Sequence, residues 1–442
     1  MHVRHSGKTL PKHVHKKTAD TGSGIASPVS QATSGPGTND SLQKTGPLKL
    51  SSGPSYYVPS RFLRVALRQN AKRAQFSSSG QVDISSGGTF HGSERGTIAV
   101  EMAGSGDKIS GESQNGGKWE CALPCTLLSK NELNIIQYDG SWYRGSMFLV
   151  AAQRGSFIVV NYVNVEDYLR GVVPLEIGHC KPDEVEAVKA QAVAARTYTY
   201  KKVLEKQGMD FDLLPTISDQ AYGGVGAENS VCNEAINNTV DQVIVCRDSL
   251  IYAYYHSTCG GKTANIEDVW ENKQPLSYLR SIDDADEKGT AFCAISGSFL
   301  WEESWSFPHL STIVNRYSRE TFPQRPAAGS IIAITIDSRF ACGRTHECTI
   351  KTSAGSYRYG GDKIRFILRR DQNGFPVLRS ALITDVSKTS GSMVFKGRGY
   401  GHGVGMCQFG AIGRARAGQS YEQILKTYYT GVELKKIGIL KQ

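Results

Sequence analysis

The sequence lacks several features that mark common protein classes. It has no run of about 18 apolar residues, so no segment is predicted to cross a membrane as a helix. Its 10 cysteines are sparse for 442 residues, which excludes a small disulfide scaffold but still permits individual disulfides. The basic N-terminus is not followed by the apolar stretch of about 7 to 15 residues that a secretory signal requires. Neither a signal peptide nor a transmembrane segment is therefore visible.

Two common motifs are incomplete. Residues 261–263 (GKT) match the end of a phosphate-binding loop, but His256 stands where the first glycine of that loop belongs. Residues 346–347 (HE) begin a zincin-like motif, but its fifth position is Ile350 instead of histidine. The sequence therefore supports neither nucleotide hydrolysis nor zincin proteolysis.

The charge balance indicates an anionic partner. Lys and Arg number 51 against 41 Asp and Glu, which gives a formal charge of +10. No basic block is interleaved with aromatic residues, and no nucleic acid-binding motif is present. An anionic cell-wall polymer is therefore a better candidate partner than nucleic acid.

The chain is predicted to fold as α+β, with β-rich N-terminal and C-terminal portions around a helical central segment. Residues 1–55 are rich in Ser, Gly, Thr, Pro and Lys and are predicted to be a disordered tail. A β-rich accessory region is expected over 56–140 and a larger domain over 141–440. Predicted strands include 61–67, 97–102, 157–160, 331–336 and 364–368, and predicted helices begin near 165, 182 and 420.

Glu176 stands in an apolar run, VVPLEI at residues 172–177. Its carboxylate must either emerge at the wall of a site or be buried with a raised pKa, because an unpaired buried charge is costly. A raised pKa is what a general acid needs. The alternative interpretation is an ordinary surface glutamate at the end of a helix.

The segment HSTCGG at residues 256–261 places two strong ligand types in front of a glycine turn. His256 and Cys259 could bind zinc, with Cys293 as a third ligand, or could form a Cys-His nucleophile pair. Equally, Cys259 and Cys293 could form a disulfide, or the loop could be purely structural.

Residues 397–405 carry glycine at every second position. A strand rarely tolerates this pattern, so the backbone is expected to turn repeatedly or to approach another segment closely. Tyr400, His402 and Gln408 are then candidates to line a substrate site. The polar loop at residues 218–224 adds Gln220 and Tyr222, although by itself it is equally well an ordinary turn.

Several of these segments together resemble the stage II sporulation protein D family, which includes amidase enhancers of bacterial cell-wall metabolism. The resemblance spans about residues 142–437. The motifs that carry it are VNVEDYLRGVVPLE at 163–176, AVKAQAVAARTY at 187–198, HSTCGG at 256–261 and GHGVGM at 401–406.

The resemblance implies a peptidoglycan lytic transglycosylase with Glu176 as the catalytic acid. Such an enzyme cleaves the bond between N-acetylmuramic acid and N-acetylglucosamine and leaves 1,6-anhydro ends. One carboxyl suffices because the substrate supplies its own nucleophile. The resemblance also implies an extracytoplasmic location and a zinc site involving His256 and Cys259.

Two other functions remain open. The first is a non-catalytic wall-binding module that enhances a cell-wall amidase. The second is a cytoplasmic protein that binds an anionic polymer.

Overall fold

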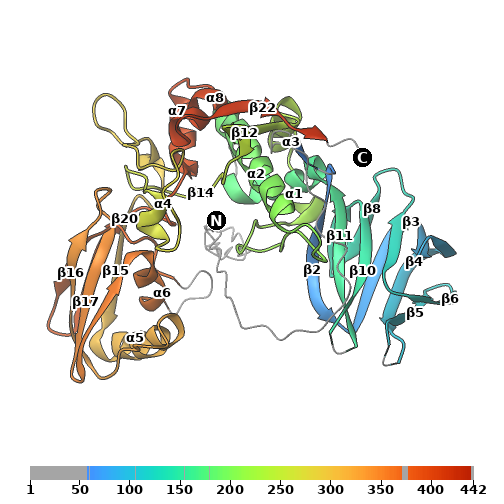
Figure 1. Ribbon diagram of the computed structural model, residues 1–442, viewed down its shortest axis with the longest axis horizontal. Coiled ribbons are helices and arrows are strands. Elements are labelled where there is room, and N and C mark those ends of the chain that lie inside the picture. The colour runs from blue at the N-terminus through green and yellow to red at the C-terminus, as the bar shows by residue number, and fades with distance from the viewer. Residues whose placement is uncertain are drawn as a thin grey trace, which may run out of the picture.

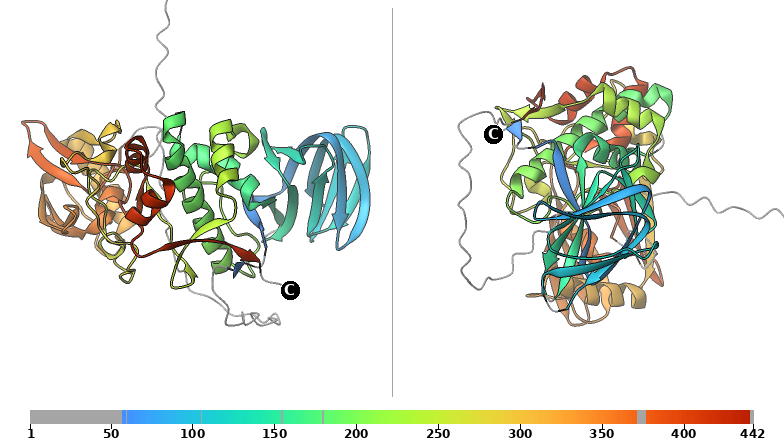
Figure 2. Two further views of the ribbon diagram at one scale, coloured as in Figure 1. Left: turned by 90° about the horizontal axis from the view of Figure 1, so that it is seen from above. Right: turned by 90° about the vertical axis from the view of Figure 1, so that its right-hand side faces the viewer.

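The computed structural model describes residues 57–58, 60–104, 106–153, 155–178, 180–370 and 377–439. The predicted tail, residues 1–55, lies outside the described residues. A group of helices lies between an N-terminal sheet and a set of C-terminal strands, and these parts follow one another along the long axis (Figures 1 and 2). The structure is thus mixed α+β, with a strand-rich N-terminal part and helices in the middle, as predicted.

The N-terminal part is a large antiparallel sheet in the order β2-β11-β10-β7-β3-β4-β5-β6, with β8 paired to β3 and β9. Alternating residues of β3, such as Val82 and Ile84, are buried, as expected for strands with one face on a core. The strands on either side of residue 140 belong to this same sheet. Its strands are β2 (Phe62–Ala71), β3 (Arg73–Ser86), β4 (Thr89–Met102), β5 (Lys108–Ser113), β6 (Lys118–Ala122), β7 (Cys125–Ser129), β8 (Ile135–Tyr138), β9 (Ser141–Arg144), β10 (Ser146–Ala152) and β11 (Ser156–Asn164).

The helical centre begins directly after β11. Asn164 caps α1 by accepting a hydrogen bond from the Glu166 amide, and Ser420 and Gln423 form a capping box at α8. The predicted helix starts near 165, 182 and 420 are therefore confirmed. The helices of this part are α1 (Val165–Ile177), η1 (Pro182–Glu184), α2 (Val185–Glu205), η2 (Gly224–Ala227), α3 (Ser230–Asn238), α4 (Ile266–Val269), η3 (Phe292–Ile295), α7 (Gln408–Arg416) and α8 (Tyr421–Tyr428).

Short strands connect segments that are far apart in the sequence. In particular, β14 and β21 pair in parallel, with Tyr255 beside Met406 and His256 beside Cys407. This pairing joins the two motifs that surround the candidate site. The short strands are β1 (Tyr57–Val58), β12 (Gln242–Cys246), β13 (Ser249–Leu250), β14 (Tyr255–His256), β21 (Met406–Cys407), β22 (Glu433–Lys436) and β23 (Gly438–Ile439).

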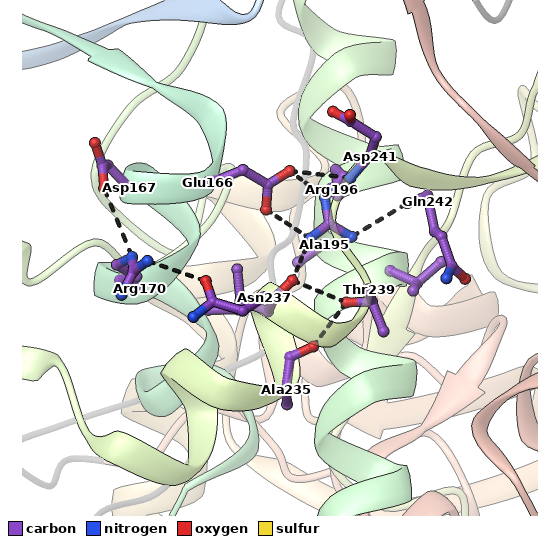
Figure 3. A network of polar contacts seen from close by, with 12 residues as sticks. Glu166, Asp167, Arg170, Ala195, Arg196, Ala235, Asn237, Thr239, Asp241 and Gln242 are labelled. Atoms are coloured by element: carbon purple, nitrogen blue, oxygen red, sulfur yellow. Dashed lines mark hydrogen bonds and ion pairs between the residues drawn. The ribbon is translucent and has the colours of Figure 1, made fainter.

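A buried ion pair fixes α1 against α2 (Figure 3). Arg196, which is fully buried, donates to both carboxylate oxygens of Glu166 at 2.8 and 2.7 Å. The same guanidinium also donates to the Gln242 carbonyl at 3.2 Å. The register of the helix that carries Glu176 is therefore fixed from its first turn.

The C-terminal strands form two three-stranded sheets, β15-β20-β19 and β16-β17-β18. They enclose a hydrophobic cluster of their own, which includes Trp305, Leu310 and Phe395. Within it, residues 364–367 form a short helix, so the predicted strand at 364–368 is wrong. The elements are β15 (Leu300–Ser306), α5 (Phe307–Thr321), β16 (Ile331–Arg339), β17 (Thr345–Thr352), β18 (Gly355–Gly360), η4 (Gly361–Lys363), α6 (Ile364–Ile367), β19 (Ile383–Lys388) and β20 (Ser392–Arg398).

The failure at residues 364–368 has a physical reason. A short apolar run has the same appearance in a buried strand and in a single buried helical turn. Here Ile364 and Ile367 face the core together, three residues apart, which is the spacing of a helix and not of a strand.

Among the described helices, none is long and apolar enough to cross a membrane.

Candidate active site

Glu176 lies in the last turn of α1 on the side of the helix that faces the core. The helical repeat of 3.6 residues places it on one stripe with apolar residues three, four, seven, eight and eleven positions before it. All members of this stripe are buried: Val165, Tyr168, Leu169, Val172, Val173 and Glu176. Gly178 then ends the helix with φ 78°, and its amide donates to the Pro174 carbonyl.

The Glu176 carboxyl is almost without partners. The residue is 1% exposed, and its Oε1 accepts one hydrogen bond, from the Ala221 amide at 3.1 Å. Its Oε2 has no hydrogen-bond partner of normal geometry among the described residues. Burial raises the pKa of Glu176 to about 8, although Ala221, Gln408 and Tyr255 each act to lower it. The carboxyl is therefore mainly protonated at neutral pH.

Tyr255 is held beside Glu176 by a chain of buried hydrogen bonds. Gln220 Nε2 donates to the Tyr255 hydroxyl oxygen at 2.9 Å. Gln220 Oε1 in turn accepts from Thr199 at 2.8 Å and from Tyr168 at 3.3 Å. Because the Tyr255 oxygen already accepts a hydrogen bond, its proton is directed toward another acceptor. The ionised form of Glu176 is such an acceptor.

Two buried glutamines also lie near the Glu176 carboxyl. Gln408, the first residue of α7, donates from Nε2 to Gln191 Oε1 at 3.3 Å. Gln408 Oε1 and Gln191 Nε2 have no hydrogen-bond partner within the described ranges. Buried polar atoms normally have partners, so unpaired ones beside an unpaired carboxyl indicate a place for a polar ligand.

The glycine ladder turns closely against the strand that carries Tyr255. Gly403 and Gly405 have φ of 88° and 73°, and a Cβ on Gly405 would lie 2.1 Å from the Tyr254 carbonyl oxygen. Just before Gly403, His402 Nε2 lies 3.0 Å from the Tyr255 carbonyl oxygen. The close approach predicted from the alternating glycines is therefore present at Gly405, because a side chain there would push the two segments apart.

Other predicted substrate-binding residues have different surroundings. His402 is 1% exposed, and burial lowers its pKa to about 3, so it is neutral. The Tyr222 hydroxyl donates to Asn161 at 2.9 Å, and its ring packs against Tyr143 and Tyr168. Tyr400 is half-buried and exchanges backbone hydrogen bonds with Thr258. The structure thus brings Gln220 and Gln408 to the surroundings of Glu176, while His402 supports the backbone of Tyr255.

A group of four potential metal ligands lies behind this site. The ligand atoms of Cys259, Asp284, Cys293 and Cys407 are all within 4.8 Å of one another, and all four residues are buried. His256, predicted with Cys259 and Cys293 as a metal ligand, lies outside this group. Its Nδ1 is 3.2 Å from the Val404 carbonyl oxygen, and its ring packs against His402. Cys259 and Cys293 therefore belong to this group of four, and His256 does not.

Comparison with known proteins connects this arrangement with a family. A family model described as stage II sporulation protein matches residues 153–246, which include Glu176 and the α1–α2 ion pair. An uncharacterized protein of Brachyspira hyodysenteriae is 30% identical over 304 residues, covering 67% of this chain and 73% of that protein. The chain belongs to the stage II sporulation protein D family. A second model, of a domain of unknown function, matches residues 293–405.

Named relatives in this family include two from Bacillus species. The amidase enhancer of Bacillus subtilis is 30% identical over 332 residues, covering 68% of this chain and 45% of that protein. The stage II sporulation protein D of Bacillus amyloliquefaciens is 26% identical over 303 residues, covering 65% of this chain and 78% of that protein.

Sequence reasoning missed three residues of these two sites. Tyr255 directly precedes HSTCGG, and an aromatic residue next to this motif is the signal that could have found it. Asp284 stands in the acidic stretch DDAD, where nothing distinguishes it from surface acids. Gln191 is a polar residue in an alanine-rich helix, and its burial follows only from the packing of α2 against α7.

Proposed function

We propose that this protein is a peptidoglycan lytic transglycosylase in which Glu176 is the general acid. The observation that carries the proposal is the buried carboxyl of Glu176, with one free oxygen and a pKa raised to about 8. A carboxyl that stays protonated at neutral pH can donate its proton to a leaving group. The relatives named amidase enhancer and stage II sporulation protein D support a substrate in the bacterial cell wall.

The proposed reaction needs one carboxyl. Glu176 protonates the glycosidic oxygen that links N-acetylmuramic acid C1 to N-acetylglucosamine, and the C1–O bond breaks. The C6 hydroxyl of the same muramic acid forms the new bond to C1, and its proton returns to Glu176. The sugar ends as a 1,6-anhydro product, and the enzyme is unchanged.

The surroundings of Glu176 support this single-acid scheme. A hydrolase of the common type needs two carboxyl groups on either side of the bond. The groups that act on the pKa of Glu176 are a backbone amide, a glutamine and a tyrosine, and no second carboxyl is among them. In the proposed scheme Tyr255 stabilises the carboxylate while the proton is on the leaving group. Gln220, Gln408, Tyr222, Tyr400 and His402 are proposed to form or support the walls of the site.

Access to the acid requires movement. Glu176 and its neighbours Tyr255 and Gln408 are each 1% exposed, so a glycan strand can reach the carboxyl only if the surrounding residues move. The positive charge of the chain, +10, favours the approach of an anionic wall polymer. We place the action of the protein outside the cytoplasm, where peptidoglycan lies.

The second candidate function is a non-catalytic wall-binding module that enhances an amidase. It is favoured by the relative named amidase enhancer, and it would use the same polar residues for binding only. In that case a cell-wall amidase is the partner, and the buried Glu176 helps to position the residues that bind the wall.

Mass spectrometry of the fragments released from purified sacculi distinguishes the two. The wild-type protein is expected to release anhydro-muramic ends, and Glu176→Gln is expected to release none while still binding sacculi. Glu234→Gln, at an exposed position on α3, serves as the matched control and should behave as wild type. Hydrated ends would indicate a hydrolase, and binding without release by the wild type would favour the amidase-enhancing module.

A further inference from the structure

The cluster of Cys259, Asp284, Cys293 and Cys407 has the composition of a metal site. The four residues come from four separate segments: the loop after β14, the loop after residue 282, helix η3 and strand β21. Each is 0% exposed. Cys259 Sγ lies 3.2 Å from Asp284 Oδ2 and 3.5 Å from Cys293 Sγ. Three buried thiols around one buried carboxylate are the donor set of a thiolate-rich metal site.

The spacing of the four ligand atoms fits a tetrahedral ion. Zinc binds thiolate sulfur at about 2.3 Å and carboxylate oxygen at about 2.1 Å, so neighbouring ligand atoms around it lie about 3.5 to 3.8 Å apart. Cys259 Sγ lies 3.2 Å from Asp284 Oδ2, slightly closer than this, and 3.5 Å from Cys293 Sγ, which is within the range. All four ligand atoms lie within 4.8 Å of one another, so small side-chain shifts of up to about 1 Å would bring them to coordination distance.

The outer contacts of the cluster orient these atoms inward. Asp284 Oδ1 accepts from Arg414 Nε at 3.0 Å and from the Tyr428 hydroxyl at 2.9 Å, which leaves Oδ2 facing Cys259. Hydrogen bonds of this kind hold a metal-binding carboxylate in one orientation.

Backbone amides also point at the sulfurs. The Cys259 and Gly410 amides donate to Cys407 Sγ at 3.1 and 3.2 Å, and the Gly261 amide donates to Cys259 Sγ at 3.3 Å. Such donors stabilise negative charge on sulfur, which is the form in which cysteine binds metal. The Gly410 amide is also the ordinary N-cap contact of α7, but a simple disulfide between Cys259 and Cys293 would not explain why the Cys259 amide donates to Cys407 or why Asp284 Oδ2 faces Cys259.

We propose that Cys259, Asp284, Cys293 and Cys407 bind one Zn²⁺ ion in a closed structural site that excludes His256. Thiolate-rich, four-coordinate sites select zinc over harder cations. Because all four positions are filled by protein, the ion has no open position for a substrate and acts by joining the four segments.

This site would stabilise the walls of the Glu176 pocket. Cys407 directly precedes Gln408, and Cys259 follows Tyr255 by four residues at the end of the same motif. The ion would thus fix β21 and the loop after β14 to each other, and with them the two side chains that face Glu176. The zinc site does not depend on whether Glu176 is a catalytic acid, because a binding module would need the same walls.

Metal analysis of the full-length protein tests the proposal. The protein is purified under reducing conditions without chelator, and the wild type is expected to contain about one zinc per chain. Cys293→Ser is expected to lower the zinc content about tenfold or more under the same conditions. Cys348→Ser, which removes another buried cysteine in the C-terminal sheet, is the matched control and should retain full zinc.

A second measurement decides the question if Cys293→Ser does not fold. Wild-type protein in which Co²⁺ replaces zinc should show strong thiolate-to-cobalt absorption in the near ultraviolet and the visible bands of a tetrahedral ion. Wild-type protein with neither zinc nor these bands would overturn the proposal. A Cys259–Cys293 disulfide found by peptide mapping of the reduced-purified protein would overturn it too.

Discussion

Helix α1 carries two glutamates, ten residues apart, that have opposite surroundings: Glu166 is partly buried and Glu176 is fully buried. Glu166, in the first turn, accepts two hydrogen bonds from Arg196 and a third from the Asp241 amide at 3.3 Å (Figure 3). Glu176, in the last turn, accepts one hydrogen bond from an amide and has an oxygen with no partner in the described part of the chain.

The difference between them is the presence of a cation. A carboxylate paired with a buried guanidinium holds two helices in register, which is a structural role. A buried carboxyl with no cation keeps its proton at neutral pH, which makes it an acid. The same residue type in the same helix is thereby suited to two tasks, and changes at each position should have different effects.

The largest expected effect is the loss of glycan cleavage in the Glu176→Gln variant. Removing a general acid typically lowers a rate by about 10²- to 10⁴-fold, and here it should leave the fold intact because glutamine is isosteric with a protonated glutamate. The measurement is the rate of release of anhydro-ended fragments from sacculi, with circular dichroism as the check of folding. A variant that retained wild-type release would remove Glu176 from the reaction.

The next effect is on stability, at the other end of the helix. Arg196→Met removes the buried guanidinium that pairs with the partly buried Glu166 carboxylate and is expected to lower the free energy of unfolding by about 2–4 kcal/mol. Denaturant unfolding measures this loss. The double variant Glu166→Gln/Arg196→Met should recover part of it, and a double variant as unstable as the single one would show that the charge is not the cause.

The free energy of unfolding of the wild type should also depend on pH through the titration of Glu176. This contribution should be absent from Glu176→Gln. Its pKa is raised by burial from 4.5 to about 8, so the folded state binds the proton more tightly than the unfolded chain. The resulting stabilisation is complete below about pH 4.5 and is lost as pH rises through about 8. Each unit of pKa difference corresponds to about 1.4 kcal/mol, so the wild type should lose a few kcal/mol relative to Glu176→Gln between pH 5 and 9. Parallel stability curves for the two proteins would contradict the raised pKa.

A smaller effect is expected at Tyr255. Tyr255→Phe removes the hydroxyl that stabilises the Glu176 carboxylate and should lower the cleavage rate about tenfold, the value of one hydrogen bond. Tyr359→Phe is the matched control, since this buried tyrosine lies in the C-terminal strands and its hydroxyl donates to the Arg325 carbonyl at 3.0 Å. Equal losses in the two variants would indicate a general packing effect.

The sequence predicted the α+β arrangement and the helix that carries Glu176, because caps and helical periodicity are local signals. The burial of Glu176 follows from the same periodicity, since it continues the apolar stripe of Leu169, Val172 and Val173. The glycine ladder likewise predicted a close backbone approach. These features depend on residues near one another in the chain.

Features that depend on distant segments could not be predicted. The unpaired state of Glu176 requires knowing that Arg196 lies at the other end of α1, and the grouping of Asp284 with Cys259 requires the fold of two loops. The apolar run at 364–368 was misassigned because its packing partners decide between a strand and a helical turn. The sequence motifs therefore locate the candidate site. Contacts between distant segments decide which glutamate of α1 is paired with an arginine and which one is the proposed acid.

The most direct test is the titration of the Glu176 carboxyl itself. Carbon-13 NMR of protein labelled at the glutamate carboxyl carbons, compared with Glu176→Gln, isolates the Glu176 signal. We expect this signal to remain that of a protonated acid at pH 6 and to titrate near the pKa of about 8. A Glu176 carboxyl that is already ionised at pH 6 would contradict the account, because the acid would then have no proton to give.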